Sequence, residues 1–235
     1  MKIIFTKLID VPDDHCPVPA SQLIPEWYKN TNSYINGSKV PVPGRQGNET
    51  TATIKRCMPI FDSITAGYII KSPADVYVIQ RTNDDGSTYP WYEWANFSLI
   101  EFHGKIQAEL HPSLNDLSAP KWVNPWGIKT PKGYSVFITQ PMHRDLPFTI
   151  LPGIVDTDTY NIPISFPFTL NDVNFQGLIP AGTPIAQVIP FKREDWQMEI
   201  GSKTSLEEMK KQDKKLRSKF YDSYKMQFRQ NKEYK

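Results

Sequence analysis

Two aspartates separated by a single residue, Asp156 and Asp158, are the residues of this 235-residue sequence whose spacing is most suggestive of chemistry. Asp156 and Asp158 follow the stretch Gly153-Ile-Val, and Tyr160 comes two residues after the pair. Two close carboxylates resist joint ionisation. We therefore expect Asp158 to raise the pKa of Asp156 or to recruit a cation to the pair.

The residues after this pair predict the strands that must hold it in place. Apolar and other residues alternate strictly from Ile162 to Leu170, which is typical of a strand with one buried face. We expect the apolar side chains to be buried, and the two prolines indicate an edge strand or an irregular pairing, because proline donates no ladder hydrogen bond. A second strand is predicted from Thr183 to Ile189, ending before Pro190.

These two stretches carry a resemblance to a known superfamily. Gly153-Ile-Val-Asp-Thr-Asp and the later Ala181-Gly-Thr-Pro-Ile-Ala-Gln-Val-Ile resemble two consecutive motifs of the trimeric dUTPase and dCTP-deaminase superfamily. This similarity covers roughly residues 125 to 192. The chain as a whole also resembles a family of uncharacterised proteins found in tailed phages and some bacteria.

The resemblance implies a mainly β, dUTPase-like jelly-roll or β-barrel core and a nucleotide site. Asp156 would orient the attacking water as the catalytic residue, and Tyr160 would pack on the deoxyribose. Asp158 and Gln187 would lie at the same pocket, Arg144 would reach a phosphate, and a bound nucleotide would bring Mg²⁺.

The phosphate-handling parts of that superfamily are largely missing from the chain. Thr159 is inserted before Tyr160, and the stretch from Gln140 to Asp145 lacks the Ser-Gly of the phosphate-binding motif. A lysine-rich segment replaces the glycine-rich C-terminal arm. The sequence therefore predicts a nucleotide-binding protein that is catalytic, degenerate or non-catalytic.

A metal site is a separate hypothesis that we derive from the histidines. His103, His111, His143 and Asp145 are the candidates, since two histidines and a carboxylate can hold non-haem iron on a jelly roll. No histidine follows His143, so the usual ligand order of such oxygenases is not present. We therefore favour no metal, and keep a metal-dependent jelly-roll enzyme as the second alternative.

The chain divides by composition into residues 1–50, an N-terminal arm with loops, residues 51–200, the β core, and residues 201–235, a basic helix. Residues 203–235 contain 11 basic and five acidic side chains, and apolar residues recur at helical spacing from Leu206 to Phe228. We expect one long amphipathic helix that buries this stripe on its own body or on a sister subunit. Its basic face could also contact nucleic acid, although a solvated face is favoured.

Two functions remain open at this point: a nucleotide-binding protein, and a phage structural, assembly or host-interaction protein that uses the fold only as a scaffold. A homo-oligomer such as a trimer is expected with either. No stretch approaches the length of an apolar membrane helix, and the first residues lack the pattern of a signal peptide. We therefore expect a cytoplasmic protein without a membrane partner, in a host cell if a phage encodes it.

Overall fold

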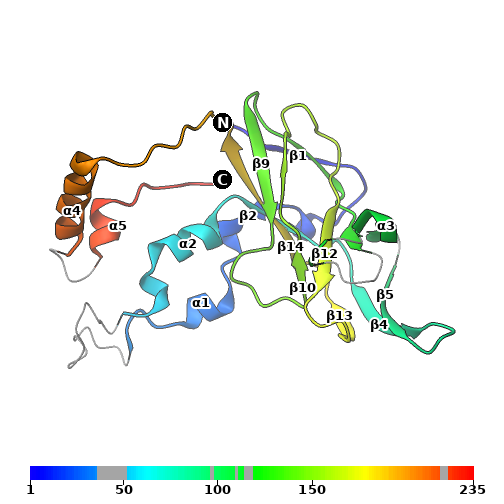
Figure 1. Cartoon of the computed structure of the whole chain (residues 1–235). Coiled ribbons are helices and arrows are strands. Elements are labelled where there is room, and N and C mark those ends of the chain that lie inside the picture. The colour runs from blue at the N-terminus through cyan, green and yellow to red at the C-terminus, as the bar shows by residue number, and fades with distance from the viewer. Residues whose placement is uncertain (36–51, 96–97, 109–110, 114–118, 218–221) are drawn as a thin grey trace. The chain divides into compact units, whose positions relative to one another are not determined.

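The computed structural model describes residues 1–235 except 36–51, 96–97, 109–110, 114–118 and 218–221 (Figure 1). The chain forms two compact units, and each is interrupted in sequence. The β unit comprises Met1–Leu23 and Gly67–Arg193, and the helical unit comprises Ile24–Ala66 and Glu194–Lys235. The first residues thus belong with the strands, because β1 pairs with β8, whereas the composition had grouped residues 1–50 as one arm.

The β unit contains all the named strands of the structure. The strands are β1 (Ile4–Lys7), β2 (Val18–Pro19), β3 (Tyr68–Lys71), β4 (Val76–Thr82), β5 (Thr88–Trp94), β6 (Ile100–Phe102), β7 (Pro120–Trp122), β8 (Trp126–Lys129), β9 (Tyr134–Thr139), β10 (Phe148–Ile150), β11 (Gly153–Val155), β12 (Phe166–Leu170), β13 (Gly177–Ile179) and β14 (Pro184–Lys192). Its helices are η1 (Asp13–His15), η2 (Ala20–Gln22) and α3 (Lys105–Ala108).

These strands pair into four sheets. Their orders are β11-β9-β14-β3-β2, β10-β12-β7-β6, β13-β4-β5 and β1-β8. All of the pairings are antiparallel. The fold is mainly β, and among the described residues no sheet closes into a barrel.

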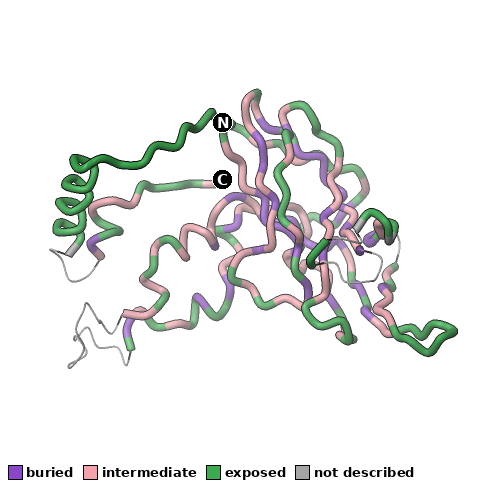
Figure 2. The backbone as a smooth tube through the Cα atoms, viewed as in Figure 1, coloured by how far each residue is buried: buried purple, intermediate pink, exposed green. Residues whose placement is uncertain are grey.

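Apolar side chains from these sheets form one core. Trp122 and Phe168 stack with their ring centroids 5.4 Å apart, and Phe148 meets Phe168 edge-on at 5.7 Å. All three side chains are fully buried, and Figure 2 shows the buried residues following the strands. Burial of such aromatic side chains is the main stabilising contribution to the fold.

Of the two strands predicted after the acidic pair, both are present, but their bounds differ from the prediction. Phe166 and Phe168 are buried as expected, but Ile162 is 55% exposed, so its predicted burial is wrong. The strand begins only at Phe166, and it lies between β10 and β7 rather than at an edge. The second predicted strand continues through Pro190 to Lys192, because Pro190 pairs with Val136 of β9.

Strands β4 and β5 form a β-hairpin. Strands β4 and β5 pair along their whole lengths, from Val76 opposite Trp94 to Thr82 opposite Thr88. The turn contains Gly86 with a φ of 83°, as the Asp-Asp-Gly sequence predicts.

The helical unit contains the remaining named helices. They are α1 (Glu26–Asn30), η4 (Ile54–Arg56), α2 (Met58–Thr65), α4 (Lys203–Arg217) and α5 (Ser223–Gln227). Met58 and Phe61, three residues apart, share one face of α2. No described helix is long and apolar enough to cross a membrane.

The expectation of one long C-terminal helix is wrong. Helix α4 ends at Arg217, and Asp222 precedes α5 with a φ of 60°, which a continuous α-helix does not permit. Within the single chain the apolar stripe of α4 is not buried, since Leu206 is 44% and Met209 59% exposed, and its burial on a sister subunit stays a prediction. Phe220 of the predicted stripe lies outside the described residues.

Candidate functional site

The acidic pair lies in a tight turn that follows edge strand β11. Strand β11 pairs with β9 through Val155 opposite Val136, and the turn begins immediately afterwards. The carbonyl oxygen of Asp156 accepts hydrogen bonds from the backbone N–H groups of Thr159 (3.1 Å) and Tyr160 (2.9 Å). The inserted Thr159 is thus accommodated within the turn, and Tyr160 stays next to the pair.

A single arginine from the end of β14 binds both aspartates. Arg193 donates to Asp158 Oδ1 at 2.9 Å and Oδ2 at 2.5 Å, and to Asp156 Oδ1 at 3.2 Å. Ser135 donates its hydroxyl to Asp156 Oδ1 at 2.6 Å. We call Ser135, Asp156, Asp158 and Arg193 the Arg193 cluster, and its arginine is the cation that we expected the pair to recruit.

The two aspartates differ in their surroundings. The Asp158 side chain is 4% exposed, whereas that of Asp156 is 62% exposed. The hydrogen bond from Arg193, followed by that from the Gly133 N–H (2.8 Å), lowers the pKa of Asp158 from 3.8 to about 2. Asp158 is therefore ionised at neutral pH and joins the residue after β14 to the turns around it, while Asp156 faces solvent.

Asp156 keeps one carboxylate oxygen available. Among the described residues, no hydrogen bond or ion pair reaches its Oδ2, and the adjoining Tyr160 is 48% exposed. An exposed carboxylate oxygen beside a half-exposed phenol ring could accept a hydrogen bond from a sugar hydroxyl. The nearest arginine, Arg193, is already occupied by two carboxylates, so the cluster offers no separate cation to a phosphate.

The other residues predicted for a nucleotide pocket are engaged elsewhere. Gln187, 1% exposed in the middle of β14, accepts a hydrogen bond from the Met142 N–H at 2.9 Å. Arg144 donates to the Leu23 carbonyl oxygen, and its burial lowers the pKa of its guanidinium. Both side chains tie loops to the β unit, and the structure does not bring either one into the Arg193 cluster.

His103, His111, His143 and Asp145 lie outside the helices and strands. His103 follows β6, His143 has a φ of 56°, and His111 accepts a hydrogen bond from the Ser113 N–H at 3.1 Å. No group of three histidine, cysteine, aspartate or glutamate side chains within the described ranges could hold a metal ion.

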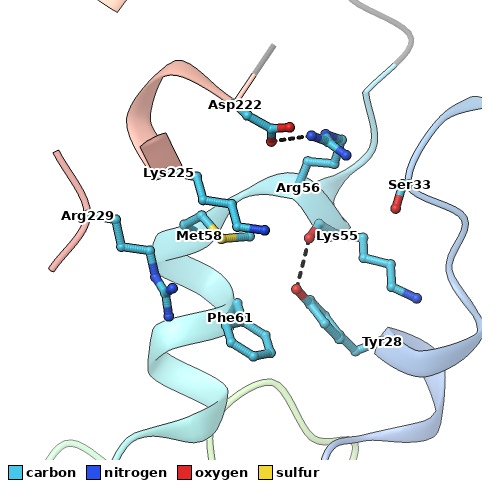
Figure 3. Close-up of a pocket in the computed structure, with 9 residues that line it drawn as sticks. All are labelled: Tyr28, Ser33, Lys55, Arg56, Met58, Phe61, Asp222, Lys225 and Arg229. Carbon is cyan, nitrogen blue, oxygen red and sulfur yellow. Dashed lines mark hydrogen bonds and ion pairs between the residues drawn. The ribbon is translucent and has the colours of Figure 1, made fainter. Parts of the chain in front are cut away.

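The helical unit contains a pocket of about 340 Å³ that the sequence did not predict (Figure 3). Basic side chains line it from η4, α5 and the residue stretch after α5, and Tyr28 and Phe61 contribute aromatic rings. These positions are far apart in sequence, and only their basic and aromatic composition could have pointed to them. Pockets of this size commonly bind small molecules.

No family model matches the sequence, and no curated protein matches it either.

Proposed function

We propose that the chain is a phage-type assembly or interaction protein, which uses a dUTPase-like β fold as a scaffold and self-associates through residues 194–202. One observation carries this proposal. Trp196, Met198 and Ile200 are 87%, 92% and 87% exposed in a segment without secondary structure, which Figure 2 shows exposed along its length.

The pattern of this segment matches an unpaired strand. Its apolar side chains alternate with Gln197 and Glu199, so an extended backbone places all three on one side. Extended segments of this kind add to an exposed sheet edge by backbone hydrogen bonds. The β unit offers such edges, for example β11 at the end of the five-stranded sheet. A second copy of the chain is the partner that supplies one.

The free energy available from burying this segment is similar in size to the cost of association. Burying each of the three side chains contributes about 1.5–3 kcal/mol, or roughly 5–9 kcal/mol together. Association costs about 4–15 kcal/mol in lost freedom. The exposed residues Leu206 and Met209 of α4 would add apolar area to the interface. In a closed ring of identical subunits, every subunit would form this interface with both of its neighbours.

Two features support the dUTPase-like scaffold without hydrolysis. Strand β9 lies between β11 and β14, so the two segments that resemble dUTPase motifs flank the same strand. Within the Arg193 cluster, the arginine neutralises the carboxylates that a hydrolase would use to orient water. These contacts favour a structural role for the acidic motif.

Two variants with the same change of charge test the proposal. Replacing Trp196, Met198 and Ile200 by lysine adds three positive charges, and replacing Gln197 and Glu199 by lysine also adds three, one and two respectively. We expect light scattering to give an oligomer for the wild type and the second variant, and a monomer for the first. A monomeric wild type, or equal masses for both variants, would contradict the proposal.

Nucleotide binding at the Arg193 cluster is the second candidate function. It is favoured by the exposed Asp156 Oδ2 beside the half-exposed Tyr160. A nucleotide that binds there must raise the melting temperature by mass action, so a thermal-shift series with deoxynucleotides, with and without Mg²⁺, tests it. The shift should disappear in Asp156→Asn, and an unchanged shift in that variant would exclude this position.

A further inference from the structure

The pocket of the helical unit is built from segments that lie far apart in the sequence. Tyr28 comes from α1, Lys55 and Arg56 from η4, Phe61 from α2, and Lys225 from α5. Figure 3 shows their side chains arranged around a common space, with Met58 between Lys225 and Phe61. Each of these segments is held by contacts within the same unit, so the pocket can be considered by itself.

Positive charge exceeds negative charge around this space. Four of the nine lining residues are basic, and Asp222 is the lining carboxylate. Arg56 forms an ion pair with Asp222, and Arg229 donates to Asp62 at 2.7 Å. These two pairs leave the ammonium groups of Lys55 and Lys225 without a carboxylate partner in the described part of the chain.

Asp62, the residue that holds Arg229, is itself firmly ionised. Burial of Asp62 would raise its pKa, but hydrogen bonds from Arg229 and Lys232 together outweigh this effect and lower the pKa. The Lys232 Nζ lies 2.9 Å from the second Asp62 oxygen. Arg229 is thereby fixed at the pocket wall, where its guanidinium lies 5.7 Å from the centre of the Phe61 ring.

Lys225 is the side chain most suited to bind a ligand. It is exposed, and it makes no hydrogen bond or ion pair with any residue that the structure describes. Figure 3 shows its ammonium group lying beside Met58, toward the interior of the pocket. Lys55 differs, because its ammonium donates to the Lys29 carbonyl oxygen at 2.7 Å. A lysine without a partner among other cations favours an anion.

Two aromatic rings form an apolar wall of the pocket. The rings of Tyr28 and Phe61 have centroids 5.8 Å apart and planes inclined by 31°. The Tyr28 hydroxyl donates to the Lys55 carbonyl oxygen at 2.8 Å, and Tyr28 is 5% exposed. The hydroxyl is thus satisfied, and the ring is held in a fixed orientation against which a flat group could pack.

We infer that this pocket binds a small phosphate monoester, whose phosphate lies against Lys225 and whose organic part packs on Phe61 and Met58. The volume suits a molecule the size of a nucleoside monophosphate. Lys225 supplies a point charge to the phosphate, while Arg56 stays paired with Asp222. This site is distinct from self-association and from the Arg193 cluster.

Calorimetric titration of the full chain with three probes tests the inference. The probes are adenosine monophosphate, inorganic phosphate and adenosine. We expect the monophosphate to bind most tightly, phosphate more weakly, and adenosine not measurably. Raising the salt concentration should weaken binding, because exposed charges are screened.

Charge reversal at two lysines locates the site. Lys225→Glu should lower the affinity for the monophosphate at least tenfold, while Lys211→Glu, at an exposed position of α4 that does not line the pocket, should leave it unchanged. Asp156→Asn should also have no effect, which separates this site from the second candidate function. Absence of monophosphate binding, equal binding of adenosine, or equal loss in both lysine variants would overturn the inference.

Discussion

Replacing Gly67 by alanine should destabilise the β unit more than any ordinary glycine substitution in a turn. Gly67 precedes β3 with a φ of 66°, and a Cβ atom built on it would lie 2.0 Å from the Val188 carbonyl oxygen. Real Cβ atoms do not approach other atoms closer than 3.0 Å, so that oxygen must move by at least 3.0 − 2.0 = 1.0 Å. Val188 is fully buried in β14 and pairs with both β3 and β9, so the strand cannot yield without losing contacts.

The magnitude follows from two contributions. A left-handed backbone costs a non-glycine residue about 1–2 kcal/mol. Overpacking of a close-packed core costs about 1–3 kcal/mol more. We therefore expect Gly67→Ala to lower the free energy of unfolding by roughly 2–5 kcal/mol, a large part of the total of about 5–15 kcal/mol typical of a domain.

Gly86→Ala is the matched control. Its φ is 83°, but nothing lies within 4 Å of the added Cβ, so it carries the backbone cost alone. Urea unfolding of both variants, followed by tryptophan fluorescence, gives the two free energies. If Gly67→Ala and Gly86→Ala lost the same free energy of unfolding, Gly67 would not lie as close to the Val188 carbonyl oxygen as the structure has it.

Three further predictions concern the β unit. In Asp158→Asn, the free energy of unfolding should depend less on pH than in the wild type. Folding lowers the pKa of Asp158 from 3.8 to about 2, so its contribution to the free energy of unfolding is fully present above pH 3.8 and is lost as the pH falls through about 2. Acid unfolding followed by circular dichroism measures this difference. Asp156→Asn should change the free energy of urea unfolding by no more than about 1 kcal/mol, because the amide oxygen still accepts from Ser135; a loss above 3 kcal/mol would contradict its exposed position. Phe168→Ala should cost about 3–5 kcal/mol in the same assay, and a loss below 1 kcal/mol would show that the aromatic core is packed differently.

The sequence predicted those features that depend on neighbouring residues. The strand predicted from Thr183 to Ile189 is present as β14, and Phe166 and Phe168 of the other predicted strand are buried as expected. The burial of Ile162 was predicted wrongly because alternation continues beyond the strand: at Pro163 the chain forms only an isolated bridge with Gly127. Periodicity shows which residues could form a strand, but pairing partners decide where the strand begins.

Features that depend on distant residues could not be predicted. Arg193 comes 35 residues after Asp158, and nothing local indicates that it will bind that carboxylate. Arg229 and Asp62 are separated by 167 residues, so the pocket of the helical unit has no local signal. The helix break before α5 depends on Asp222 in a left-handed conformation, and the sequence there contains no glycine or proline to indicate it.

The discontinuity of the helical unit has a consequence for synthesis on the ribosome. Asp62 emerges early, whereas Arg229 and Lys232 emerge only after the whole β unit has been translated. A nascent chain can therefore fold its strands while Asp62 still lacks both partners, since contacts between distant residues form late. The helical unit can be completed only once Arg229 and Lys232 have been synthesised, and a premature stop codon after residue 193 would leave strands β1–β14 intact in sequence but Asp62 without these two cations.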